Sequence, residues 1–464
     1  MPPPLATAIY VIGIVALFVF GRERGRHISW ATWIPTIWLL IACSRHVTEW
    51  LALGKTVPIL SQQQYLEGSP LDASFYAILI AAAIIVLATR RKAVVPILRK
   101  NWVIILFVIY CALSVTWSDF PGVALKRWIR SLGDYAMVLV LLTESDRWAA
   151  IRTTLARIAF VLLPLSILFI KYYPTMGRAN GSHWAVSATM VGVTDNKNML
   201  GLTCLVLGFA ALCSVLRTLS QPRRDRFRML AVHGAVVLMA IYLLLVCQSM
   251  TSLSCLVLAS GVIVAHSFVR TARKHIILHA MVATVIAGSI AVLFLGMGNG
   301  ALHDIGRNST LTGRTAIWAI LRTVPVNPYI GTGFESFWLG PRLSHLWTFQ
   351  ILDGITEAHN GYFEMYLNLG LVGDLFIGAL LWIGYRRIMR SLDADTYSGH
   401  LRLGYWIIAV IYNFTEAGFR SGDVIWFALL LAVMAPMVRP AQPAPRASVP
   451  KLVLKNRAAT AVKV

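Results

Sequence analysis

Charged side chains are scarce in this chain of 464 residues, because Asp, Glu, Lys and Arg together make up only 13% of it. A soluble protein carries about a quarter charged residues, so this chain lacks the polar surface that would cover a soluble core of its length. Hydrophobic residues account for 57% of the chain, and the mean hydropathy is +0.68. The composition therefore excludes a soluble globular protein and predicts one that spans a membrane several times.

The sequence also lacks the motifs of several protein classes. It contains no Walker A loop, no DxD-like metal pair and no HExxH motif, so neither an ATP-driven pump nor a nucleotide-sugar transferase is favoured. The six cysteines lie within or beside apolar runs and form no CxxC pair, which predicts small buried side chains without disulfides. The N-terminal MPPPLATAIY has no basic residue, so we expect no cleaved signal peptide.

What the sequence does contain is a series of apolar runs, about thirteen of them, which approach the roughly 20 residues that cross a bilayer core. We therefore predict an all-α fold, a polytopic membrane helical bundle of about 12–13 transmembrane helices within residues 1–437. One large, partly helical periplasmic loop is expected at 297–361, because structureless connections of that length are uncommon. The predicted spans lie near 5–20, 29–44, 72–89, 102–117, 131–143, 156–172, 199–216, 229–247, 252–269, 276–296, 362–385, 403–415 and 423–438.

The positions of Lys and Arg orient this bundle. Basic loops such as GRERGR (21–26), RRKAVVPILRK (90–100) and RTLSQPRRDRFR (217–228) fall on one side, which is therefore cytoplasmic, with the N-terminus outside. The net charge of +22 has the same origin, so we expect contact with anionic membrane lipid and no nucleic-acid binding. The Pro/Ala-rich residues 438–464 are predicted to be a basic, disordered cytoplasmic tail.

Because Lys and Arg favour cytoplasmic loops, cationic side chains on the outer side are unexpected. Several of them converging at the lipid boundary would bind an anion such as a pyrophosphate, which Arg holds bidentately. Each also has a plainer interpretation, because an outer Arg can reach lipid headgroups or pair with a loop carboxylate. The candidates for substrate binding are Arg127, Arg130, Arg178, Lys197 and Arg314.

The end of the long loop carries groups that can exchange a proton. The imidazole of His359 can accept a proton near neutral pH, as a general base that activates a hydroxyl must. Glu357 could orient His359 or serve as the base itself. The alternative is that His359, together with Asn360, caps the helix that follows. No metal or other cofactor is expected at this site.

Four strings in and around the outer loops resemble the O-antigen ligase/polymerase family of bacterial envelope glycan assembly. They are VGVTDNKNMLG (191–201), TGRTAIW (312–318), NPYIGTGFESFW (327–338) and EAHNGYFEMYLNLGLVG (357–373). The GFESFW string and its spacing look most like the exopolysaccharide polymerase branch. The likeness covers roughly residues 100–385, and it lies in the order and spacing of these short motifs.

The resemblance implies a glycosyltransferase of the cell inner membrane whose active site faces the periplasm. Such an enzyme takes an undecaprenyl-pyrophosphate-linked oligosaccharide and transfers the glycan to an acceptor hydroxyl, without nucleotide or obligatory metal. Carried over, His359 is the general base and Arg314 a pyrophosphate ligand, while Arg127 or Arg130, Lys197 and Asn198 line the donor site. Asn360 and Arg178 are further candidates for substrate binding. One departure is Met250, where family members often have a basic residue.

Three functions stay open at this point. The first is a polymerase that joins lipid-linked repeat units into exopolysaccharide, with polysaccharide export or chain-length proteins as partners. The second is a ligase that moves O-antigen onto lipid A–core, which shares the donor and the chemistry. The third is a transporter of an anion or a lipid-linked glycan, for which we would expect internal repeats and mid-membrane charges. The sequence contains no such repeat and few such charges.

Overall fold

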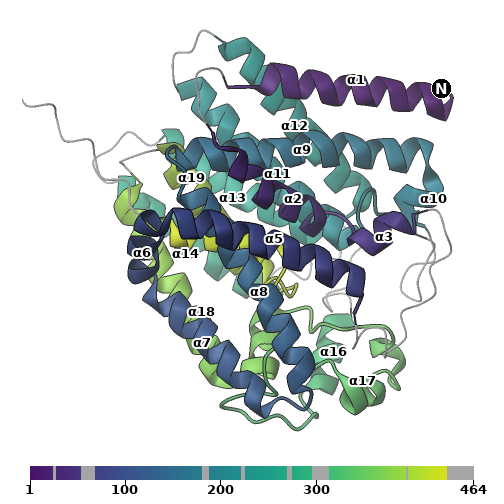
Figure 1. The fold of residues 1–464 in the computed structure, drawn as a ribbon, viewed down its shortest axis with the longest axis vertical. Helices are drawn as coiled ribbons and strands as arrows, with labels where there is room; N and C mark the ends of the chain where they lie inside the picture. Colours follow the sequence, from purple (N-terminus) through teal and green to yellow (C-terminus); the bar gives the residue numbers. More distant parts are fainter. Residues whose placement is uncertain are drawn as a thin grey trace, which may run out of the picture.

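The structure is a computed structural model that describes residues 1–23, 28–53, 68–179, 188–220, 225–268, 274–294, 313–392 and 396–435. Almost all of its regular structure is helical (Figure 1). In the described residues the strands are limited to one antiparallel pair, β1 (Arg178–Ala179) with β2 (Thr189–Met190). The predicted all-α fold is confirmed.

The described α-helices are named as in Figure 1. In chain order they are α1 (Pro3–Gly21), α2 (Trp33–Ala42), α3 (Val47–Leu51), α5 (Pro70–Thr89), α6 (Arg91–Lys100), α7 (Trp102–Ser114), α8 (Pro121–Leu142), α9 (Arg147–Tyr172), α10 (Pro174–Gly177), α11 (Lys197–Ser220), α12 (Arg226–Cys247), α13 (Met250–Phe268), α14 (Lys274–Phe294), α16 (Arg314–Leu321), α17 (Gly340–Leu346), α18 (Gly361–Ser391), α19 (Thr396–Tyr412) and α20 (Val424–Met434).

Every predicted span coincides with helix, but fewer helices are long and apolar enough to cross a membrane alone. Among the described residues eight pass on length and composition, or nine if the bent pair formed by α6 and the helix that follows it is one span. The two halves of that pair meet at 85°. The helices α2 and α20 are shorter and apolar. The multi-pass membrane architecture therefore stands, whereas a count of 12–13 would need α8 and α19 as well as these shorter helices, and neither α8 nor α19 passes the test.

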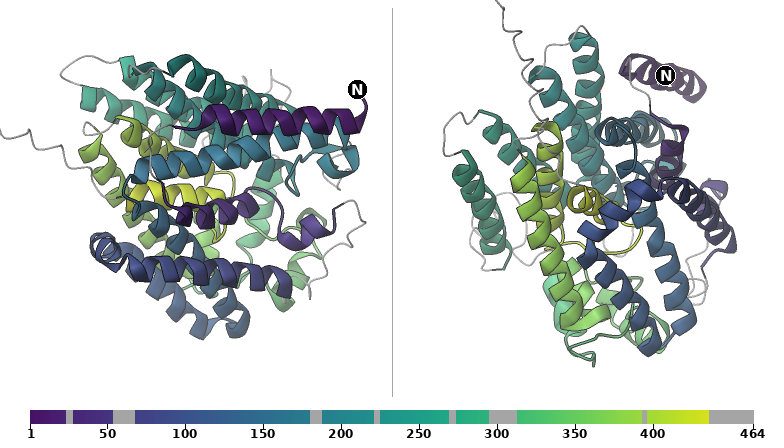
Figure 2. Two further views of the ribbon diagram at one scale, coloured as in Figure 1. Left: turned by 45° about the horizontal axis from the view of Figure 1, so that its top comes forward. Right: turned by 60° about the vertical axis from the view of Figure 1, so that its left-hand side comes forward.

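The bundle has two distinct ends. The short helices α3, α10, α16 and α17 lie together at the right of Figure 1, whereas α6 lies at the left. We call the first of these the loop end. The helices α9 and α11 form the centre, since 67% and 78% of their most apolar segments are buried, whereas α1 lies at the margin with 6% (Figure 2). All six cysteines are free and buried, as predicted.

The long loop before α18 has a core of its own at the loop end. Side chains of α16 and α17 pack together with Phe337, Trp338, Leu352 and Ala358. Burial of such apolar surface stabilises a loop that would otherwise expose its backbone. Residues 297–312 of the predicted loop and the predicted tail 438–464 lie outside the described residues.

The helix α18 is broken at Gly370, where φ is +66° and ψ is −166°. Residues 328–333 fill the break with four backbone hydrogen bonds. The amides of Thr332 and Gly333 donate to the carbonyls of Leu367 and Asn368, at 3.1 and 2.8 Å. The amides of Leu371 and Val372, just after the break, donate in turn to the carbonyls of residues 328 and 329, at 2.9 and 3.1 Å. The NPYIGTG string thus anchors the long loop to α18 and so positions the candidate site.

Candidate functional site

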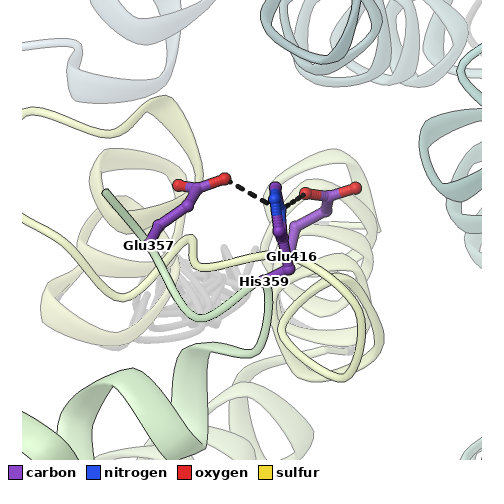
Figure 3. Close-up of side chains that lie close together, drawn as sticks. All are labelled: Glu357, His359 and Glu416. Atoms are coloured by element: carbon purple, nitrogen blue, oxygen red, sulfur yellow. Dashed lines mark hydrogen bonds and ion pairs between the residues drawn. The ribbon is translucent and has the colours of Figure 1, made fainter. Parts of the chain in front are cut away.

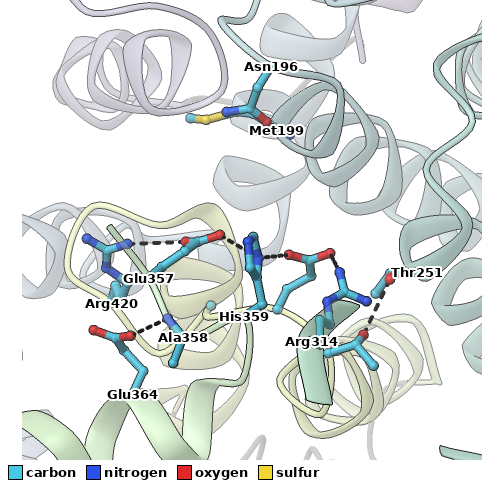
Figure 4. Close-up of polar contacts among 12 residues, drawn as sticks. Asn196, Met199, Thr251, Arg314, Glu357, Ala358, His359, Glu364 and Arg420 are labelled. Atoms are coloured by element: carbon cyan, nitrogen blue, oxygen red, sulfur yellow. Dashed lines mark hydrogen bonds and ion pairs between the residues drawn. The ribbon is translucent and has the colours of Figure 1, made fainter. Parts of the chain in front are cut away.

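Five side chains of alternating charge form a row at the loop end. Figure 3 shows its centre, where Nδ1 of His359 lies 3.0 Å from Oε1 of Glu357 and 3.2 Å from Oε2 of Glu416. The row continues at both ends, with Arg314 paired to Glu416 and Arg420 paired to Glu357 at 3.2 Å (Figure 4). Residues separated by a hundred positions in sequence therefore meet in one hydrogen-bonded unit.

Three segments supply this row. Arg314 is the first residue of α16, which begins after Gly313 in the left-handed region. Glu357 and His359 precede α18, and Glu416 and Arg420 lie in the loop between α19 and α20. The pairing of loops from different parts of the chain is typical of functional sites on helical scaffolds.

Asn360 and Asn413 hold two of these loops together. The side chain of Asn360 caps α18 by accepting from the amide of Phe363 at 2.9 Å, and it donates to the carbonyl of Phe414 at 3.1 Å. Asn413 accepts the amides of Gly418 and Phe419 at 2.8 and 2.9 Å. The capping role that the sequence left open for Asn360 is therefore observed. Its role in substrate binding stays a prediction.

The backbone at His359 is strained, with φ at +48°. The peptide before it is held on both sides, because Trp318 donates to the carbonyl of Ala358 at 2.8 Å and Glu364 accepts its amide at 2.8 Å. A non-glycine residue in this region costs of order 1–3 kcal/mol and persists where its surroundings enforce it. This strain sets the direction in which the imidazole points.

The charges of the row decide where its proton lies. Burial alone would lower the pKa of His359, but its hydrogen bonds to Glu357 and Glu416, together with their charges, raise it to about 10. Burial would raise the pKa of Glu357, but His359 and Arg420 outweigh it and lower the pKa to about 2. At neutral pH His359 is therefore a cation between two carboxylates.

These three groups also have the spacing of a metal site. Their ligand atoms all lie within 4.8 Å of one another. However, a protonated imidazole cannot ligate a metal, and Arg314 and Arg420 already compensate the two carboxylates. A cation bound here would have to displace the proton of His359 and compete with Arg314 and Arg420 for the two carboxylates.

The other predicted cations have different surroundings. Arg127 donates to the carbonyl of Glu335 at 2.8 Å, and the guanidinium of Arg130 lies 4.4 Å from the ring centroid of Tyr76. Arg178 donates to the carbonyl of Ile170 at 3.0 and 3.1 Å, and so satisfies a carbonyl of the last turn of α9. The structure thus gives Arg178 a structural contact and sets it apart from the row.

Lys197 and Asn198 are the first residues of α11. The side chain of Asn196 accepts the amide of Met199 at 2.8 Å and so begins this helix. In Figure 4 Asn196 and Met199 face the row of charges from the opposite side. A helix N-terminus with a Lys in its first turn favours anions. The donor role of Lys197 and Asn198 stays a prediction.

Sequence reasoning missed Glu416, which bridges Arg314 and His359. In NFTEAGFR (413–420) it is a single carboxylate beside a span, and nothing in the spacing links it to residues 57 or 102 positions away. The nearest signal was Arg420, an outer cation four residues later. Carboxylates that hold catalytic groups are found by their tertiary contacts and seldom by spacing.

The fold and this site together define a polytopic helical membrane protein with a charged site at one end of its bundle. Residues 234–378, which include Arg314, Glu357 and His359, match the family described as O-antigen ligase. The chain is also 26% identical over 327 residues to the exopolysaccharide production protein ExoQ of Rhizobium meliloti (strain 1021). This match covers 68% of the chain and 72% of that protein. Over these residues the chain is similar to the O-antigen ligase/polymerase family, as its motifs predict, and this similarity supports an enzymatic role.

Proposed function

We propose that this protein polymerises undecaprenyl-pyrophosphate-linked oligosaccharide repeat units into exopolysaccharide at the periplasmic face of the inner membrane. The observation that carries the proposal is the row from Arg314 to Arg420, which joins a cation suited to a diphosphate to an imidazole–carboxylate pair suited to proton transfer. The similarity to a protein named for exopolysaccharide production supports a polymerase over other members of the family.

The diphosphate of the donor binds between Arg314 and the N-terminus of α11. The guanidinium of Arg314 exchanges its contact with Glu416 for the diphosphate, and Lys197 faces it from the other side. As the bond between the anomeric carbon and the phosphate oxygen breaks, negative charge develops on the leaving group. Preorganised cations stabilise that charge better than water does, because they need no reorganisation.

The acceptor hydroxyl attacks the anomeric carbon, and undecaprenyl pyrophosphate leaves with the electron pair of the broken bond. The proton of the hydroxyl passes to Glu357, since protonated His359 has no lone pair to offer. A weakly basic carboxylate suffices because glycosyl transfer has an oxocarbenium-like transition state, in which the hydroxyl loses its proton late. His359 therefore orients Glu357 and adds positive charge, which changes the general-base role expected for it from sequence.

The matching family is described as O-antigen ligase, so a ligase is the second candidate. Donor and chemistry are shared, and only the acceptor differs. A deletion strain separates the two. Accumulated single lipid-linked repeats support the polymerase, whereas long chains that lack attachment support the ligase.

The polymerase is tested by chain extension from purified lipid-linked repeats without added metal or nucleotide. We expect Glu357→Gln to lower turnover by about 10²- to 10⁴-fold, as loss of a general base does, while binding of undecaprenyl pyrophosphate persists. Arg314→Ala should lose that binding. Asp353→Asn, an exposed carboxylate in the same loop, is the matched control and should extend chains like the wild type. Full turnover in Glu357→Gln would contradict the assignment of the base.

A further inference from the structure

Asp134 is a buried carboxylate that the mechanism above does not use. It lies in α8, within the span predicted at 131–143, and only 1% of its surface is exposed. A carboxylate is costly in such a place unless its oxygens are hydrogen-bonded. Because Asp134 is too buried to contact a substrate, any part that it has in the reaction must pass through the residues that it holds.

Both carboxylate oxygens of Asp134 accept a hydrogen bond. Oδ1 accepts the indole N–H of Trp38 in α2 at 3.0 Å, and Oδ2 accepts the backbone amide of Gly422 at 2.8 Å. Gly422 lies in the loop between α19 and α20, which also supplies Glu416 and Arg420 to the row. Asp134 thus connects the helical bundle to one of the three segments that build the candidate site.

The loop residues around Gly422 form a tight turn. The amide of Asp423 donates to the carbonyl of Arg420 at 3.2 Å, and Gly422 has φ at +76°. Glycine takes a positive φ in such a turn without strain. The amide of Ser421 donates to Oε1 of Glu335 at 3.2 Å. The last three amides of the turn are therefore all bonded, and two of them depend on carboxylates from outside it.

One face of α8 holds this turn. Arg127 and Asp134 are seven residues apart, which is close to two helical turns and places them on the same side of α8. Arg127 donates to the carbonyl of Glu335, the residue whose carboxylate accepts the amide of Ser421. The turn is therefore anchored to α8 directly through Asp134 and a second time through Arg127.

The turn carries Arg420, which contacts the proposed base. Nη1 of Arg420 lies 3.2 Å from Oε2 of Glu357, whereas Nδ1 of His359 lies 3.0 Å from Oε1 (Figure 4). The carboxylate of Glu357 is thus held from both sides. A displacement of the turn would move Arg420 and leave Glu357 held by His359 alone.

We propose that Asp134 is a positioning residue for the reaction. Through its bond to the amide of Gly422, it holds Arg420 in place against Glu357. The inference rests on the proposed function, in which Glu357 receives the proton of the acceptor hydroxyl, and it adds the residue that fixes this base. Asp134 itself contacts no substrate.

The test is a double-mutant cycle in chain extension by the purified full-length protein. We expect Asp134→Asn and Arg420→Gln each to lower kcat by about 10- to 100-fold, since a displacement of about 1 Å has effects of this size. Donor KM should stay within about twofold, because the Arg314 end is unchanged. With both changes, Asp134→Asn should cost less than about twofold beyond Arg420→Gln, since no guanidinium is left to position. A merely structural role would multiply the two losses.

Trp38→Phe tests the hydrogen bond itself. Asparagine at position 134 keeps the size of the carboxylate but offers one acceptor oxygen to two N–H donors. Removal of the indole N–H leaves that oxygen to Gly422, so Trp38→Phe should raise the kcat of Asp134→Asn by about 3- to 10-fold. Asp374→Asn is the matched control and should keep the wild-type kcat. It changes another carboxylate in an apolar helix, one whose Oδ1 has no hydrogen-bond partner in the described part of the chain.

Four outcomes would overturn the proposal. They are equal losses from Asp134→Asn with and without Arg420, a raised donor KM at unchanged kcat, no recovery with Trp38→Phe, and unchanged hydrogen–deuterium exchange in the peptide that contains residues 420–423. The exchange measurement needs no activity, so it separates this inference from the proposed function. Faster exchange in Asp134→Asn, with a wild type that extends no chains, supports the anchor and removes the polymerase. Multiplied losses in an active wild type do the reverse.

Discussion

At the scale of single residues, the row shows how neighbouring charges set the state of one imidazole. His359 is partly buried, which would favour its neutral form, yet two carboxylates within 3.2 Å keep it protonated. Because its pKa in the folded protein lies above the ordinary 6.5, the protonated form stabilises the fold fully below about pH 6.5. This contribution is lost as the pH rises through about 10.

Glu416 is expected to set the pH at which the rate of chain extension falls on the alkaline side of the pH–rate profile. The rate of chain extension should stay level through neutral pH and fall as His359 loses its proton near 10. Glu416→Gln removes one of the two charges that hold this proton, so the falling limb should move to lower pH. The measurement is the pH–rate profile of the purified enzyme, with circular dichroism recorded at each pH.

Asp353→Asn should leave the limb where it is, because its carboxylate is exposed and does not contact the row. A rate that rises with pH toward 10 would mean that neutral His359 is the base, and would contradict the proposal that Glu357 is the base and His359 orients it.

At the scale of elements, the break in α18 joins the long loop to the bundle. Gly370 has backbone angles that only glycine adopts freely, and a Cβ there would lie 2.3 Å from the backbone of Tyr329. The sequence predicted a turn at NPYIGTG from its Asn-Pro and glycines. It did not indicate that this turn hydrogen-bonds to the break in a helix about 40 residues later. Hydrogen bonds between residues so far apart leave no local pattern in the sequence.

Gly370→Ala should therefore destabilise the protein by several kcal/mol, since both the backbone angle and the space forbid a methyl group. Gly378→Ala in the same helix is the control. A Cβ there meets nothing within 4 Å, and alanine is the better helix former by up to about 1 kcal/mol. Thermal unfolding in detergent measures the stability of both variants. Equal midpoints for the two variants would show that the break does not depend on Gly370.

At the scale of the whole molecule, the start of α16, the segment before α18 and the loop between α19 and α20 meet, so the whole charged row lies at one end. The orientation is testable because all six native cysteines are buried and react poorly with reagents. A cysteine at Thr348, exposed near α17, should react with a membrane-impermeant thiol reagent in intact cells. A cysteine at Lys92, exposed on α6 at the opposite end, should react only after lysis. The reverse pattern would place the row in the cytoplasm.

Much of this architecture was predictable because hydropathy and basic loops act locally. Each predicted span coincides with helix, since about 20 apolar residues in lipid must satisfy their own backbone hydrogen bonds. Arg314, Glu357 and His359 were also found from sequence, because short motifs flank them. Arg178 contacts a helix carbonyl in α9, which the sequence did not indicate, and its role in substrate binding stays a prediction.

The sequence by itself determined the membrane class, the helical segments, the resemblance to a family and three members of the charged row. Only the tertiary structure decided which carboxylates hold His359 and where its proton lies. The physical reason is one of range. Hydropathy and helix-forming patterns can be recognised within about 20 consecutive residues. A pKa depends instead on charges within a few ångströms in space, wherever their residues stand in the chain.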